Sequence, residues 1–136
     1  MREAERARGV IVTLPDGTKL TWPIVCVDFD GVLAEYHGYQ TMHEQFPPLK
    51  GTGGRNLLYC LHHYEYTVVI HSARPKAEIE AWRARHDLAE FVSLVTSEKV
   101  PAVAYVDDRA VRFHPSMSTS EILDAIKEPA HWERTP

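Results

Sequence analysis

The sequence predicts one α/β domain built around a mostly parallel β-sheet. Short apolar runs that suit buried strands alternate along the chain with segments whose apolar residues recur at helical spacing. In addition, polar residues stand where several of these runs end, as expected when the carboxyl ends of parallel strands meet at one edge of a sheet. A chain of 136 residues can enclose one ordinary hydrophobic core, so we expect residues 1–136 to form a single domain.

The composition narrows the class of protein. Hydrophobic residues make up 44% of the chain and charged residues 25%, which are values typical of globular domains. The net charge of −4 argues against broad electrostatic binding to nucleic acid or to anionic membranes. The N-terminal stretch MREAERARG has no apolar signal region, and no later segment approaches membrane-spanning length. We therefore expect a cytoplasmic protein without membrane contact.

The first predicted element is a β-hairpin. Residues 10–14 and 19–22 suit strands and flank the sequence PDGT, in which proline and glycine favour a tight reversal. We therefore expect residues 1–23 to form an N-terminal hairpin extension and residues 24–128 to form the core of the domain.

The core is predicted to contain four buried strands and three helices. Apolar runs bounded by polar residues indicate the strands, which lie in PIVCVDF, YTVVIHS, FVSLV and AVAYVDD. The helical spacing of apolar residues predicts helices over 54–64 and 76–88. The sequence STSE at 118–121 is typical of a capping box, which predicts a last helix that continues to Lys127.

The first core strand ends in two carboxylates. Asp28 and Asp30 are two residues apart, so both side chains should project to one side where the strand ends. Gly31 then allows the chain to turn sharply. A single acid in such a place often only caps the next helix, so this pair alone does not establish a site.

Further polar residues accompany the other strands. Ser72 ends the second strand, Asp107 and Asp108 end the fourth, and Lys99 precedes the fourth. Four acids would then converge, and two unit charges about 4 Å apart repel by roughly 4 kcal/mol at an effective dielectric constant near 20. One lysine cannot balance four acids, whereas Mg²⁺ prefers oxygen ligands and can also bind a phosphate. The sequence therefore predicts a Mg²⁺ site at this edge of the sheet.

Four segments in this order, DFDGVLA, VVIHSAR, Lys99 and YVDDRA, resemble the motifs of the haloacid dehalogenase superfamily of phosphohydrolases. The resemblance covers about residues 24–113 and is closest to small capless members; the last motif is also similar to that of polynucleotide kinase phosphatase domains. It implies a Rossmann-like three-layer sandwich and a Mg²⁺-dependent phosphatase. Residues 35–54 are too few to form a separate cap domain, so we expect none.

The resemblance also implies catalytic roles for individual residues. Asp28 would be the nucleophile that forms an aspartyl-phosphate, and Asp30 would be the general acid and base. Ser72 would bind a phosphoryl oxygen. Lys99 would balance the charge of nucleophile and phosphate, but it stands only a few residues before the fourth strand, and Lys76 is the alternative for this role.

The same resemblance implies a set of metal ligands. The Asp28 carboxylate, the Asp30 backbone carbonyl and Asp107 would hold Mg²⁺. Asp108 is the less certain metal ligand. Only one of two successive side chains can point ideally at the metal, so the other could act through a water molecule or by positioning Lys99.

The expected substrate is a small phosphomonoester, either a nucleotide or the phosphorylated end of a short oligonucleotide. Arg74 and Arg109 follow two of the motifs and are expected to contact substrate, with surface ion pairs as the alternative. Arg55, beyond the 35–54 loop, is also expected to contact substrate. Tyr36 and Tyr39 in that loop could stack on a base, or could simply pack the loop onto the sheet. The sequence leaves the oligomeric state open.

Two alternatives remain at this point. A receiver-type signalling domain also combines acids, a hydroxyl residue and a lysine around Mg²⁺, but its lysine follows the acids, whereas Lys99 precedes Asp107 and Asp108. A catalytically idle relative could serve as a phosphate-binding module, although such a protein would be free to lose Asp30.

Overall fold

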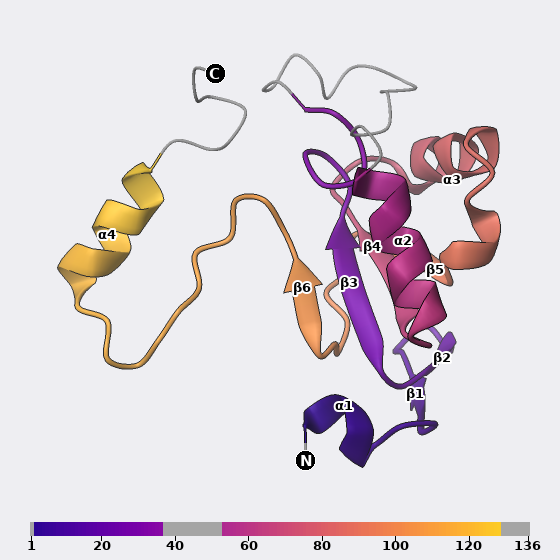
Figure 1. The fold of residues 1–136 in the computed structure, drawn as a ribbon, viewed down its shortest axis with the longest axis horizontal. Coiled ribbons are helices and arrows are strands. Elements are labelled where there is room, and N and C mark those ends of the chain that lie inside the picture. The colour runs from indigo at the N-terminus through magenta and orange to yellow at the C-terminus, as the bar shows by residue number, and fades with distance from the viewer. Residues whose placement is uncertain (1, 37–52, 129–136) are drawn as a thin grey trace.

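The computed structural model describes residues 2–36 and 53–128. It has an α/β fold in which a parallel four-stranded sheet is accompanied by a separate antiparallel hairpin (Figure 1). The sheet lies in the spatial order β5-β4-β3-β6 and consists of β3 (Ile24–Asp28), β4 (Thr67–His71), β5 (Leu94–Thr96) and β6 (Ala104–Val106). The predicted α/β class, the mostly parallel sheet and the N-terminal hairpin are therefore confirmed.

The hairpin forms where its turn sequence predicts it. Strand β1 (Ile11–Thr13) pairs with β2 (Lys19–Thr21), and Gly17 in the connecting turn has a φ of +91° that favours glycine. The Thr18 N–H donates to Asp16 Oδ1 at 3.0 Å, which closes this turn. A short helix, α1 (Glu3–Arg6), precedes the hairpin and was not expected from the sequence.

Two helices pack on one face of the sheet. These are α2 (Gly53–His63) and α3 (Lys76–Arg85), which agree closely with the predicted ranges. Alternate residues of β3 and β4 bury their side chains against Leu58 of α2 and against Ile79 and Trp82 of α3. Trp82 is fully buried and meets the ring of Phe29 edge-on, with the ring centroids 4.7 Å apart. Phe29 is thereby anchored in the core between the two acids of the first motif.

The opposite face of the sheet is covered differently. Ile24, Cys26 and Val69 pack there against residues of the hairpin and against Val100, which lies in the connection from β5 to β6. Within the described ranges no helix covers this face. The described residues therefore do not show the three-layer sandwich implied by the resemblance. Helices cover one face of the sheet, and the hairpin with the β5-β6 connection occupies part of the other.

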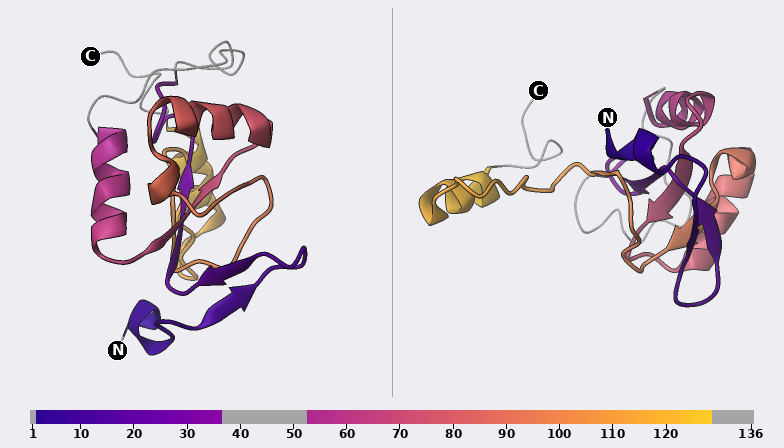
Figure 2. Two further views of the ribbon diagram at one scale, coloured as in Figure 1. Left: turned by 90° about the vertical axis from the view of Figure 1, so that its right-hand side faces the viewer. Right: turned by 90° about the horizontal axis from the view of Figure 1, so that it is seen from below.

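The last helix, α4 (Thr119–Lys127), begins as its sequence predicts. The Ser118 hydroxyl accepts from the Glu121 N–H at 3.1 Å, and Glu121 Oε1 accepts in return from Ser118, which completes the capping box. Figure 1 and the right-hand view of Figure 2 show α4 apart from the sheet, and none of its residues is buried.

Strand β5 begins later than predicted. A turn of 3-10 helix, Ala89–Phe91, occupies the start of the segment FVSLV, so that pairing with β4 begins at Leu94. Within residues 2–36 and 53–128, no helix is long and apolar enough to cross a membrane.

Candidate active site

The polar residues predicted at separate strand ends meet at the carboxyl edge of the sheet. Asp28 at the end of β3 lies opposite His71 in β4, and Val27 lies opposite Val106 in β6, so that Asp107 follows at the level of Asp28. A cavity of about 240 Å³ lies at this edge. The sequence-predicted residues that line it are Asp28, Asp30, Ser72, Arg74, Asp107 and Arg109.

Asp28, Asp107 and Asp108 form a compact group of acids. A carboxylate oxygen from each lies within 4.8 Å of the others. Burial and then the charge of Asp107 raise the pKa of Asp28 to about 7, although the Phe29 N–H donates to Asp28 Oδ1 at 2.9 Å and opposes the shift. A divalent cation among these oxygens would relieve the same repulsion. The three carboxylates are also the hard oxygen donors that Mg²⁺ takes, so they fit the predicted ion.

Gly31 allows Asp108 to lie against the turn that follows β3. Gly31 has a φ of +85°, and a Cβ at this position would lie 2.1 Å from Asp108 Oδ2. The Asp108 side chain is only 7% exposed. Any larger residue at position 31 would therefore have to displace a buried carboxylate. The glycine of the first motif thus serves close approach as well as the turn.

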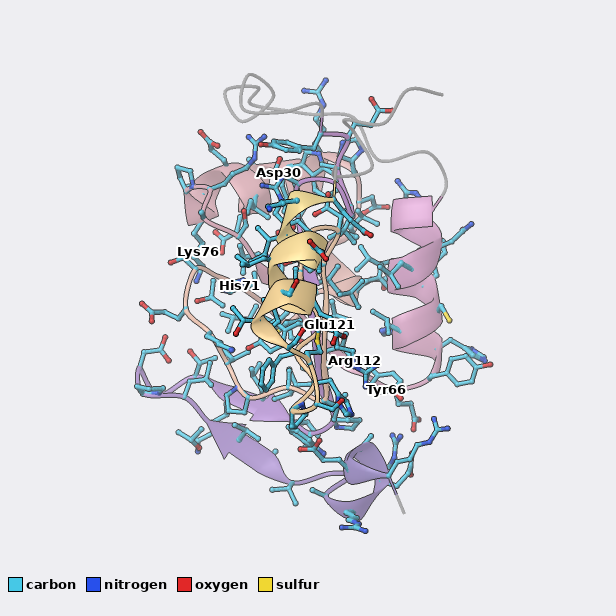
Figure 3. The ribbon with its side chains drawn as sticks, turned by 90° about the vertical axis from the view of Figure 1, so that its left-hand side faces the viewer. Asp30, Tyr66, His71, Lys76, Arg112 and Glu121 are labelled. Carbon is cyan, nitrogen blue, oxygen red and sulfur yellow. The ribbon has the colours of Figure 1, made fainter. Side chains whose placement is uncertain are left out.

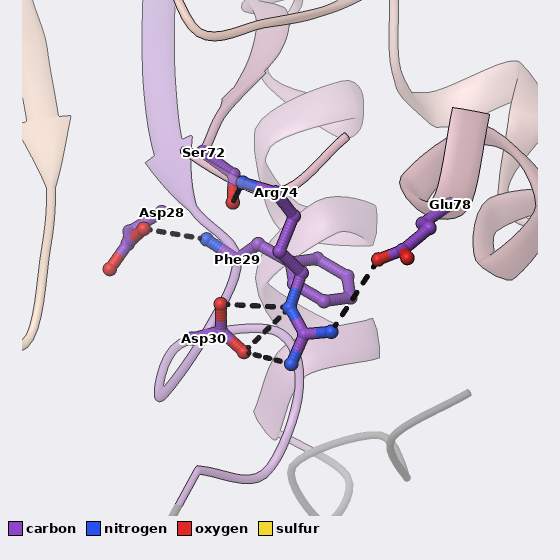
Figure 4. A network of polar contacts seen from close by, with 6 residues as sticks. All are labelled: Asp28, Phe29, Asp30, Ser72, Arg74 and Glu78. Atoms are coloured by element: carbon purple, nitrogen blue, oxygen red, sulfur yellow. Dashed lines mark hydrogen bonds and ion pairs between the residues drawn. The ribbon is translucent and has the colours of Figure 1, made fainter. Parts of the chain in front are cut away.

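Asp30 is held by a buried arginine (Figure 4). The Nε of Arg74 donates to both carboxylate oxygens of Asp30, at 3.1 and 3.0 Å, and its Nη2 donates to Oδ1 at 2.8 Å. The Arg74 side chain is 2% exposed and lies over the Phe29 ring. Its Nη1 is also 3.8 Å from Glu78 Oε2. Arg74, predicted as a substrate contact, is therefore first of all a partner of Asp30. A charged guanidinium at this depth is stabilised by the carboxylate beside it.

Ser72 and Arg109 also line the cavity. Ser72 is buried, and its Oγ accepts from the Arg74 N–H at 3.1 Å, which orients the hydroxyl at the end of β4. The Arg109 N–H donates to Asp107 Oδ1 at 2.9 Å, and Arg109 Nε lies 3.8 Å from Asp108 Oδ1. Arg109 therefore contacts two of the three acids, Asp107 through its neutral backbone N–H and Asp108 through its positively charged side chain.

Asp108 joins the group of acids without lining the cavity, and two further predicted residues lie outside it. Lys99 lies in an adjoining cleft, with its Nζ 5.5 Å from the ring centroid of Tyr105. Arg55 donates from α2 to the backbone oxygen of His86 at 3.0 Å, at the C-terminus of α3. Its predicted contact with substrate phosphate is therefore not supported. The local sequence is compatible with Arg55 pointing to the substrate or to the end of α3. The packing of α2 beside α3 decides for the end of α3.

Lys76, the alternative to Lys99, also lies outside the cavity. It lines the same adjoining cleft as Lys99, and its Nζ is 3.9 Å from Glu80 Oε1. Neither lysine is placed to balance the Asp28 charge directly.

Sequence reasoning did not single out His71, which lines the cavity. The signal was available, because His71 precedes Ser72 at the end of an apolar run and is the β4 residue that pairs with Asp28. Its ring stands edge-on to Tyr105, with the centroids 6.1 Å apart.

The predicted loop 35–54 is described only at its beginning and end. Tyr36 is buried and lines the cavity, and the Arg109 guanidinium lies 5.0 Å from its ring centroid. This contact favours packing over base stacking for Tyr36. Tyr39 lies outside the described residues.

No protein-family model matches the chain, and no curated protein or solved structure matches it significantly.

The raised pKa of Asp28 predicts how the stability of the metal-free protein depends on pH. Between pH of about 4 and about 7, folded Asp28 keeps a proton that the unfolded chain has already released, so raising the pH favours unfolding across this window. We expect Asp28 to lower the melting temperature in chelator as the pH rises from 4 to 7, so that the change over this range is less favourable for wild type than for Asp28→Asn. Equal slopes for the two proteins would contradict the pKa assignment.

Proposed function

We propose that this chain is a Mg²⁺-dependent phosphomonoester hydrolase of the haloacid dehalogenase type, acting on nucleotides or on terminal phosphates of short nucleic acids. The observation that carries the proposal is the convergence of Asp28, Asp107 and Asp108 at the carboxyl ends of β3 and β6. Ser72 and Asp30 line the same cavity, which supports phosphoryl transfer there.

Asp28 is the proposed nucleophile. One of its carboxylate oxygens forms a bond to phosphorus while the ester oxygen leaves with its electron pair, giving an aspartyl-phosphate. Asp30 gives a proton to the departing alkoxide. In the second step, Asp30 takes a proton from water, the water oxygen attacks phosphorus, and the bond to Asp28 breaks to release inorganic phosphate.

Asp28, Asp107 and Asp108 would hold the Mg²⁺, and the resemblance adds the backbone carbonyl of Asp30. When bound, the ion supplies positive charge that stabilises the transferred phosphoryl group. Arg109 adds a positive charge beside Asp108. Because the Ser72 oxygen accepts from the Arg74 N–H, its hydroxyl hydrogen would be the group that donates to a phosphoryl oxygen.

The pairing of Asp30 with Arg74 favours a second candidate, a catalytically idle phosphate-binding module. Arg74 donates to both oxygens of Asp30, so proton transfer requires an oxygen that remains able to reach the leaving group. A receiver-like domain is a related possibility, since it would accept a phosphoryl group on an aspartate without rapid turnover.

Release of phosphate from p-nitrophenyl phosphate tests the proposal against both candidates. We expect multiple turnovers in Mg²⁺, none in excess chelator, and recovery when Mg²⁺ is restored. Undiminished turnover in chelator would remove the metal from the mechanism. Binding of inorganic phosphate without turnover of any phosphomonoester would favour the idle module, and a single stable phosphorylation would favour the receiver.

A further inference from the structure

We propose that the N-terminal hairpin forms one wall of a cleft that binds the leaving group of the substrate, a neutral ring-bearing alcohol of nucleoside size. The inference rests on the proposed function and names the part of the chain that selects the substrate. It assigns this selection to the hairpin and the β5-β6 connection.

The cleft shares Arg74 with the cavity that Asp28, Asp30 and Asp107 line. It has a volume of about 710 Å³, which is within the range of about 300–1,000 Å³ typical of small-molecule sites. It is lined by residues 13–16 of the hairpin, by residues 94–101 and by Arg74 and Lys76. Figure 3 shows Lys76 on the same side of the body as the tip of the hairpin.

The lining of the cleft suits a neutral ring. Leu14 and Val100 are buried and belong to one apolar cluster beneath the hairpin, so the cleft has an apolar floor. Hydroxyl groups stand among these residues, on Thr13, Thr96 and Ser97. An apolar floor with a few hydroxyls is the usual lining of sites for ring compounds that carry hydrogen-bonding groups.

The charges around the cleft are balanced. Lys76 and Lys99 are accompanied by Asp16 and Glu98, while Arg74 is paired with Asp30. A second anionic group on the ligand would therefore meet as many acids as lysines, and one of these lysines, Lys76, already lies 3.9 Å from Glu80 Oε1. This balance favours a neutral leaving group, such as a nucleoside, over one that carries another phosphate.

Arg74 joins the cleft to the proposed chemistry. It lines both the cleft and the acid cavity, and it holds Asp30, the proposed proton donor to the leaving oxygen. With the phosphate beside Asp28, the leaving oxygen has to approach Asp30. The rest of the alcohol then lies beside Arg74, where the cleft begins.

Isothermal titration of adenosine 5′-monophosphate and of inorganic phosphate tests the inference without relying on turnover, provided that every protein compared also carries Asp28→Asn so that the nucleotide is not hydrolysed. Ser97→Trp would fill the cleft, and Ser93→Trp is the matched control, because Ser93 is an exposed serine at the other end of β5. We expect Ser97→Trp to weaken nucleotide binding by about tenfold or more, with phosphate affinity changed by less than about twofold. Ser93→Trp should bind both ligands as wild type does.

A second pair of variants examines the hairpin directly. Thr13 lines the cleft, so Thr13→Trp would place a large ring in it. Thr21 is an exposed residue of the hairpin outside the cleft, so Thr21→Trp is the control. Thr13→Trp should weaken nucleotide binding as Ser97→Trp does, and Thr21→Trp should not. If Ser97→Trp does not fold, this pair still tests whether the cleft binds the nucleotide.

Nucleotide affinity that is the same in all four variants and wild type would overturn the inference. Equal losses of nucleotide and phosphate affinity in Ser97→Trp and Thr13→Trp would also overturn it, because the damage would then lie in the phosphate cavity. Failure of wild type to hydrolyse any phosphomonoester would remove the proposed function, while nucleotide binding that only the cleft variants weaken would still support the cleft.

Discussion

Asp28→Asn should abolish phosphatase turnover while leaving the fold intact. An amide is nearly isosteric with the carboxylate but cannot attack phosphorus, so we expect kcat to fall by about a thousandfold or more, equivalent to roughly 4 kcal/mol in barrier height. Steady-state hydrolysis of p-nitrophenyl phosphate measures the loss. In chelator at pH 8, the melting temperature should rise, because the substitution removes a carboxylate whose ionised form is disfavoured by burial and by Asp107.

Asp124→Asn is the matched control for this substitution. Asp124 is exposed on α4, outside the acid cavity, so the same chemical change there should alter neither kcat nor the melting temperature appreciably. If Asp28→Asn kept more than about a tenth of the wild-type rate, a barrier change below roughly 1.4 kcal/mol, Asp28 would not be the nucleophile.

Gly31→Ala should destabilise the protein and disrupt the acid cluster together. A side chain at positive φ costs about 1–2 kcal/mol, and the contact of the new Cβ with Asp108 Oδ2 adds about 1–3 kcal/mol of overpacking. If the protein relaxes by moving Asp108, the gain in melting temperature on adding Mg²⁺ should shrink or disappear. Chemical denaturation with and without Mg²⁺ measures both effects.

Gly17→Ala separates the cost of a side chain at positive φ from the cost of the contact with Asp108. Gly17 has a φ of +91°, close to that of Gly31, but a Cβ there would meet nothing within 4 Å. Gly17→Ala should therefore show the backbone cost alone and keep the full Mg²⁺ response. Equal destabilisation by the two substitutions, with Mg²⁺ responses alike, would show that the approach of Asp108 to Gly31 does not matter.

The order of the elements followed from local sequence patterns. The hairpin turn PDGT, the apolar run that forms β3 and the capping box before α4 each contain their own signal within a few residues, and each forms where predicted. The beginning of β5 was less predictable, because an apolar run such as FVSLV is compatible with a 3-10 turn as well as with a strand.

The positions of Asp28, Ser72 and Asp107 around one cavity were also accessible from sequence. Parallel strands bring their carboxyl ends to one edge, so a polar residue at the end of each apolar run is directed there by the topology itself. The approach of Asp108 to Gly31 was only partly accessible, because the glycine predicts a turn but not the side chain that lies against it.

What the tertiary structure alone decided is where the long side chains lie. An arginine or lysine spans several ångströms and can reach more than one partner, so its sequence position leaves its contacts open. Arg74 turns to Asp30, Arg55 reaches the end of α3, and Lys99 lies over Tyr105. The sequence by itself determined the strands and the acids at their ends, because short side chains follow the backbone. The partners of the basic residues, and the cleft between the hairpin and the β5-β6 connection, arise only when segments distant in sequence pack together.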